Sequence, residues 1–134
     1  MREWKLKLKE EGISEERYSE LKALARRYDE LKELDGQWRR GELDKEYSGN
    51  TVWHGHSDPT GREGVRLAVN PFAQKVAMIE QAAILADAEI CRWVLRNVTQ
   101  GVAYEKLNPP CDRNRFFRAR RIFFVELHKA TKFL

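Results

Sequence analysis

The sequence predicts an all-α fold: a helical bundle with a C-terminal helix-turn-helix and an N-terminal helical arm. Three observations lead to this prediction. Apolar residues recur at helical spacing over long stretches, and residues suited to capping a helix precede these stretches. The last quarter of the chain also has the pattern of a short helix, a proline turn and a long helix rich in arginine and phenylalanine. With 134 residues, the chain has the length of one domain and an appended arm.

The arm, residues 1–35, is expected to contain one amphipathic helix from about Ser14 to Leu34. Ser14 is a suitable N-cap, and glutamates follow it in the first turn, where carboxylates suit the positive end of the helix dipole. Gly36 offers a C-terminal stop. The apolar residues of this helix are Tyr18, Leu21, Leu24, Ala25, Tyr28 and Leu31.

Residues 36–58 are predicted to form a linker, because glycines interrupt a polar stretch that lacks apolar periodicity. His54, His56 and Asp58 in this stretch could supply two imidazoles and a carboxylate to a metal ion. No second cluster of metal-ligating residues accompanies them, so we predict a plain linker and no bound metal.

The helical domain is assigned to residues 59–134, with its strongest start signal at Asn70 as cap and Pro71 as first helical residue. The apolar pattern after Pro71 permits one long helix to about Val98. A break near Asp87, with Asp87 as a new cap, is the alternative. Glycine at position 101 ends this stretch in either case.

The predicted helix-turn-helix begins with a short helix at about residues 103–107. Pro109 and Pro110 cannot continue it, because each lacks a backbone N–H and restricts the residue before it. Asp112 is then a good N-cap for the long second helix.

A helical wheel separates the long helix into an apolar side and a polar side. The apolar side, which we expect to be core, consists of Phe116, Ala119, Phe123 and Leu127, with Phe117 and Phe124 on its shoulder. The polar side consists of Asn114, Arg118, Arg121 and Val125, with Arg115 and Lys129 beside them. Arg120 projects toward the apolar side, so we expect it to pair with a carboxylate such as Glu89 or Glu105, or to contact a phosphate around the helix edge.

Charge is concentrated in the same segment. Residues 109–134 carry seven arginines and lysines against two carboxylates, a net charge of +5, whereas the whole chain carries +4. A basic end on a near-neutral body is typical of a surface that binds a polyanion. Arginine can pair with guanine and asparagine with adenine in the major groove. The predicted DNA-binding residues are Arg113, Asn114, Arg115, Arg118 and Arg121.

Several runs of the sequence resemble small prophage-encoded proteins of Gram-positive bacteria. The resemblance depends on residues 79–90, 98–105 and 110–124, and residues 12–18 and 57–60 fit the same group. The layout, a leading helix followed by a helix-turn-helix similar to region 4 of sigma factors, is similar to phage transcription regulators of the ArpU/RinA type. The resemblance thus implies a phage-derived regulator of transcription.

Other functional classes find little support. No apolar run approaches the roughly 20 residues of a membrane span. The sequence contains no phosphate-binding loop and no evident nucleophile–base set, so we expect neither catalysis nor a cofactor. Two cysteines, Cys91 and Cys111, are too few for a disulfide scaffold, which indicates a cytoplasmic protein with reduced thiols.

The sequence therefore predicts a DNA-binding transcription regulator whose partner is double-stranded DNA. One alternative is a phage-encoded inhibitor, such as an anti-defence protein, that binds a protein of a host nucleic-acid machine. Another is a small DNA-packaging subunit. The sequence leaves the oligomeric state open, a homo-oligomer included.

Overall fold

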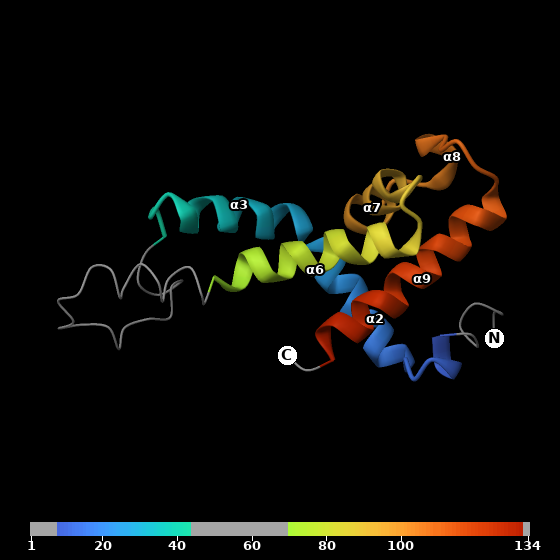
Figure 1. The fold of residues 1–134 in the computed structure, drawn as a ribbon, viewed down its shortest axis with the longest axis horizontal. Helices are drawn as coiled ribbons and strands as arrows, with labels where there is room; N and C mark the ends of the chain where they lie inside the picture. Colours follow the sequence, from blue (N-terminus) through green and yellow to red (C-terminus); the bar gives the residue numbers. More distant parts are fainter. Residues whose placement is uncertain (1–7, 44–69, 133–134) are drawn as a thin grey trace. The chain divides into compact units, whose positions relative to one another are not determined.

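The computed structural model describes residues 8–43 and 70–132, and these residues contain helices and no strand (Figure 1). The predicted all-α class is thereby confirmed. The helices are α2 (Glu15–Arg26), α3 (Tyr28–Arg39), α6 (Pro71–Ala86), α7 (Cys91–Gln100), α8 (Tyr104–Leu107) and α9 (Arg113–Thr131).

The chain divides into two compact units. The first consists of Met1–Asp29 and Ala77–Leu134, and it contains α2, the second part of α6, and α7 to α9. The second, Glu30–Val76, contains most of α3 and the first turns of α6.

Helix α9 forms the centre of the first unit, where it packs against α2 and α7 (Figure 1). Its apolar side is fully buried, as the wheel predicts for Phe116, Ala119, Phe123 and Leu127. Phe124 is buried as well, and its ring meets the ring of Tyr18 from α2 edge to face, with centroids 5.1 Å apart. Aromatic pairs of this geometry add to the free energy that burial provides.

The predicted single N-terminal helix is wrong, because the chain breaks at Arg27 into α2 and α3. The cap at Ser14 is confirmed, since its hydroxyl accepts a hydrogen bond from the backbone N–H of Arg17. At the break, the backbone N–H of Arg27 turns to the carbonyl of Leu24, three residues back, and the α-helical pattern of bonds is interrupted. No glycine or proline marks this point. Residues before it pack on α7 and α9, whereas those from Glu30 onward belong to the second unit.

The predicted stop at Gly36 is also wrong, because α3 continues through this glycine to Arg39. Tertiary contacts within the second unit hold this last turn. The indole of Trp38 is buried and lies edge-on to the ring of Phe72, with centroids 6.0 Å apart. The side-chain amide of Asn70 donates to a carboxylate oxygen of Asp35 at 2.9 Å. Burial of a large aromatic outweighs the cost of about 1 kcal/mol for glycine inside a helix.

Asn70 caps α6 as predicted: its side-chain oxygen accepts from the backbone N–H groups of Phe72 and Ala73. Of the two possibilities for the following stretch, the structure has the break, since α6 ends at Ala86 and α7 begins at Cys91. Asp87 accepts a hydrogen bond from the backbone N–H of Glu89 in the connecting turn. The N-cap residue of α7 is nevertheless Ile90, which makes no side-chain capping bond, so the predicted role of Asp87 as its cap is wrong.

Candidate nucleic-acid interface

The segment between α7 and α9 contains two turns whose backbone conformation suits the residues at those positions. Gly101 ends α7 in the left-handed conformation, with φ of 73°. The single turn of α8 then ends at Asn108, which is also left-handed, with φ of 48°. Glycine and asparagine are the residues that adopt this conformation most readily. The hydroxyl of Tyr104 donates to the carbonyl oxygen of Cys111 at 3.0 Å, which fixes the proline turn against α8.

Asp112 caps α9, as predicted, by accepting the backbone N–H of Arg115 at 2.8 Å. The cap fixes where the helix begins, and the helical period decides which side chains share a face. Asn114, Arg118 and Arg121 follow at spacings of four and three residues, so they form one stripe along α9.

Arg115 is bound to carboxylates within the protein. Its guanidinium bonds both carboxylate oxygens of Asp87, at 2.8 and 3.0 Å, and it contacts Glu89 at 3.1 Å. These hydrogen bonds hold the pKa of Asp87 below its usual value, although partial burial acts in the opposite direction. The same bonds raise the pKa of Arg115. Arg115 therefore ties the first turn of α9 to the turn between α6 and α7.

Arg113 is also paired, in a more exposed position. Its guanidinium lies 2.6 Å from a carboxylate oxygen of Glu105 on α8. It also lies over the ring of Phe117, at 4.9 Å from the centroid, and near that of Tyr104, at 5.8 Å. Ion pairs between exposed side chains contribute little stability and exchange readily for other partners.

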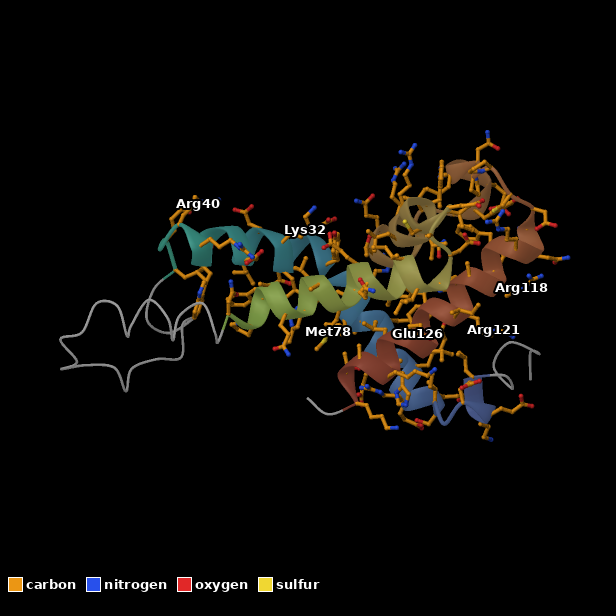
Figure 2. The ribbon with its side chains drawn as sticks, viewed as in Figure 1. Lys32, Arg40, Met78, Arg118, Arg121 and Glu126 are labelled. Carbon is orange, nitrogen blue, oxygen red and sulfur yellow. The ribbon has the colours of Figure 1, made fainter. Side chains whose placement is uncertain are left out.

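Arg118 and Arg121 differ from both, because their side chains make no hydrogen bond or ion pair with any residue in 8–43 or 70–132. Arg118 is exposed and Arg121 half-buried, and Figure 2 shows both projecting away from α9. Asn114, one turn earlier, is exposed as well. We call the surface formed by Asn114, Phe117, Arg118 and Arg121 the open face of α9.

Phe117 on this face is a residue whose exposure the sequence analysis did not anticipate. Its side chain is 39% exposed, whereas its neighbour Phe116 is fully buried. The ring is held by Phe116, at 5.4 Å between centroids, and by Tyr104, at 6.2 Å. Its position three residues after Asn114 and four before Arg121 was the available signal, since this spacing places it beside the polar stripe.

Arg120 has a structural role, with partners other than those expected. It donates to the side-chain oxygen of Asn97 on α7 at 2.9 Å and to the hydroxyl of Tyr18 on α2 at 3.0 Å. The expected carboxylate partner is therefore wrong, and Glu89 and Glu105 instead pair with Arg115 and Arg113. Arg120 joins α9 to two other helices of the first unit.

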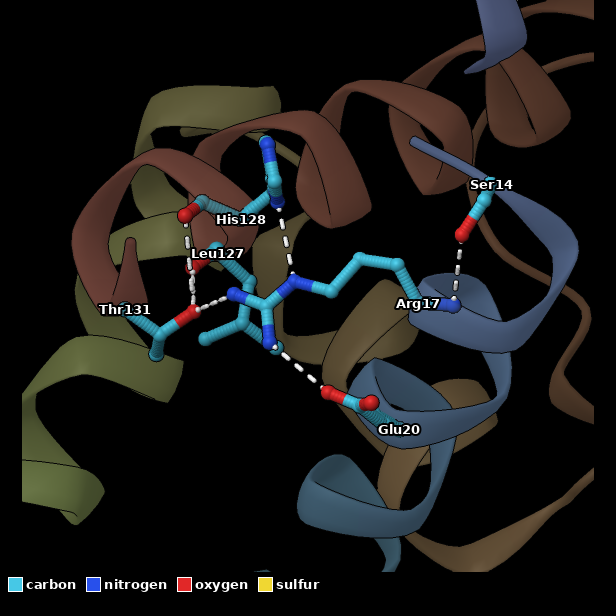
Figure 3. A network of polar contacts seen from close by, with 6 residues as sticks. All are labelled: Ser14, Arg17, Glu20, Leu127, His128 and Thr131. Carbon is cyan, nitrogen blue, oxygen red and sulfur yellow. Dashed lines mark hydrogen bonds and ion pairs between the residues drawn. The ribbon is translucent and has the colours of Figure 1, made fainter. Parts of the chain in front are cut away.

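The C-terminal half of α9 is held by α2 through Arg17 (Figure 3). Its guanidinium donates to Nδ1 of His128 at 3.0 Å and to the hydroxyl of Thr131 at 2.6 Å, and it pairs with Glu20 at 3.1 Å. Because arginine can only donate, His128 must accept at Nδ1 and is therefore neutral. Partial burial, followed by the charges of Arg17 and Lys132, lowers the pKa of His128.

Neither a metal centre nor a membrane span is found in the part of the chain that the structure describes. Within it, no three histidine, cysteine, aspartate or glutamate side chains gather closely enough to hold a metal ion. None of its helices combines the length and the apolar character needed to cross a bilayer. His54, His56 and Asp58, together with most of the predicted linker, lie outside the described residues.

No protein-family model, curated protein or solved structure matches this chain. The resemblance to phage regulators therefore stays a prediction from the sequence.

Proposed function

We propose that the protein is a phage-derived transcription regulator that binds double-stranded DNA through the open face of α9. In this proposal α8 and α9 act as a helix-turn-helix, and α9 enters the major groove. The observation that carries the proposal is the contrast among the arginines of α9. Arg113, Arg115 and Arg120 have partners within the fold, whereas Arg118 and Arg121 have none among the described residues.

The placement of this face along α9 supports the proposal. Helix α2 covers the later part of α9 through the contacts of Tyr18 with Phe124 and of Arg17 with Thr131. The open face lies in the N-terminal half. In a helix-turn-helix the recognition helix contacts base edges with its N-terminal residues. The open face thus lies in the half of α9 that a helix-turn-helix directs to the bases, and within this half α2 bonds Arg120, which is not part of the face.

The polar side chains of the open face can form hydrogen bonds with DNA. The amide of Asn114 can pair with adenine, and the guanidinium groups of Arg118 and Arg121 can pair with guanine or with phosphates. Arg113 can exchange its exposed partner Glu105 for a phosphate. Arg115 would position α9, because its donors already bond Asp87 and Glu89.

Duplex binding by the full chain tests the proposal. We expect affinity to fall steeply as salt rises, because each neutralised phosphate releases counterions. Arg118→Ala and Arg121→Ala should each cost about 1–3 kcal/mol on a preferred site. Arg26→Ala is the matched control, because Arg26 is an exposed arginine on α2 with no side-chain partner among the described residues. Folded protein that binds no duplex at low salt, or equal affinities for all four proteins, would refute the proposal.

A protein partner is the second candidate, favoured by exposed apolar side chains on α6. Ile84 and Leu85 are 48% and 56% exposed. If the partner is a protein that binds this part of α6, Leu85→Ala should weaken the complex, and Arg118→Ala should leave DNA affinity unchanged.

A further inference from the structure

We infer that Phe117 reads thymine, by packing its ring against the C5-methyl group of this base in the major groove. This inference rests on the proposed function and extends it from binding DNA to the class of site that is bound. It assigns a recognition role to a residue that sequence analysis placed at the edge of the core.

Phe117 is an exposed phenylalanine whose ring packs against other side chains of the first unit. The ring is 39% exposed, yet it contacts Phe116, Tyr104 and the guanidinium of Arg113. Glu105 holds Arg113 in turn, with 2.6 Å between nitrogen and oxygen. An aromatic ring that is already ordered loses little conformational entropy when it binds a ligand.

The side chains beside Phe117 on the open face are polar and suited to base edges. Phe117 lies one helical turn from Asn114 and one turn from Arg121. Side chains one turn apart have Cβ atoms roughly 5–6 Å apart, and successive bases of one strand are about 3.4 Å apart. Phe117 and Asn114 can therefore reach the same base pair or adjacent ones.

The major groove offers one apolar group for a phenylalanine ring to contact. The edges of guanine, cytosine and adenine present hydrogen-bond donors and acceptors, whereas thymine also presents its methyl group. Asn114 is suited to adenine, whose partner is thymine. An asparagine followed by an exposed phenylalanine three residues later is thus complementary to an A·T pair.

The test replaces thymine by uracil, which removes the methyl group and keeps the hydrogen-bonding edge. The probe is the duplex that wild-type protein enriches from a random-sequence pool, synthesised with single thymine-to-uracil changes. For wild type we expect at least one change to weaken binding about fourfold, the ratio that corresponds to burying one methyl group. Phe117→Ala should bind the thymine and uracil duplexes equally, whereas Phe117→Leu should keep part of the preference.

Ile84→Ala is the matched control, because Ile84 is an exposed apolar residue on another helix, and it should keep the full preference. A cooperative melting transition above the assay temperature would show that each variant is folded. If Phe117→Ala keeps the wild-type preference for thymine, or if wild type shows none, the inference is wrong and the proposed function stands. If wild-type protein enriches no duplex, both fail.

Discussion

The two sides of α9 are made from the same kinds of residue and have opposite environments. On one side Phe116, Phe123 and Phe124 are buried and Arg120 bonds to two other helices. Phe117, on the shoulder between the two sides, is exposed, and on the polar side Arg118 and Arg121 have no partner among the described residues. Residue type therefore does not separate structural from binding roles in this helix. The neighbours of each side chain do: Phe117 and Phe124 lie seven residues apart on the same shoulder of α9, and α2 packs on Phe124.

The largest expected difference in stability is between alanine variants of the buried Phe123 and of the exposed Phe117. Phe123→Ala should lower the free energy of unfolding by about 3–5 kcal/mol, because the ring is fully buried and its removal leaves a cavity. Phe117→Ala should lower it by about 1 kcal/mol, because the ring is partly exposed but loses its contacts with Phe116 and Tyr104. Chemical denaturation of both variants measures the difference. Equal losses would show that Phe117 belongs to the core.

A smaller difference in stability is expected between methionine variants of Arg120, which is bonded within the fold, and of Arg118 on the open face. Arg120→Met should cost about 2–3 kcal/mol of stability, because Tyr18 and Asn97 lose a charged hydrogen-bond partner in a partly buried position. Arg118→Met is the matched change on the open face and should stay within about 0.5 kcal/mol of wild type. Thermal and denaturant unfolding check both values. A destabilised Arg118→Met would mean that this side chain supports the fold.

The smallest effect on stability is expected from the titration of His128, whose imidazole contacts Arg17 of α2. Its pKa is lowered in the folded state, so the unfolded chain binds a proton more readily. The contribution of this site to stability is complete above the unfolded pKa, about 6.5, and is lost as pH falls toward the lower folded value. The melting temperature of wild type should therefore fall more than that of His128→Gln between pH 7 and pH 5. Parallel curves for the two proteins would contradict the Arg17–His128 contact.

Local signals in the sequence were sufficient for several helix ends in the described residues. Ser14, Asn70 and Asp112 cap helices with their own side chains, and Gly101 ends α7. These features depend on hydrogen bonds between residues a few positions apart, so they can be read from a short window of sequence. The side of α9 that forms the core follows from its apolar period for the same reason.

Interactions between distant residues decided what the local signals could not. Arg120 finds its partners 23 and 102 positions away, at Asn97 and Tyr18. The helix break at Arg27 and the passage of α3 through Gly36 have no signal in their neighbouring residues, because packing within each unit outweighs intrinsic helix propensity there. The sequence of α9 shows several arginines but not which of them are paired within the fold. Only the folded chain shows that Arg113 and Arg115 form ion pairs with carboxylates. It also shows that Arg118 and Arg121 have no partner among the described residues and lie on the open face.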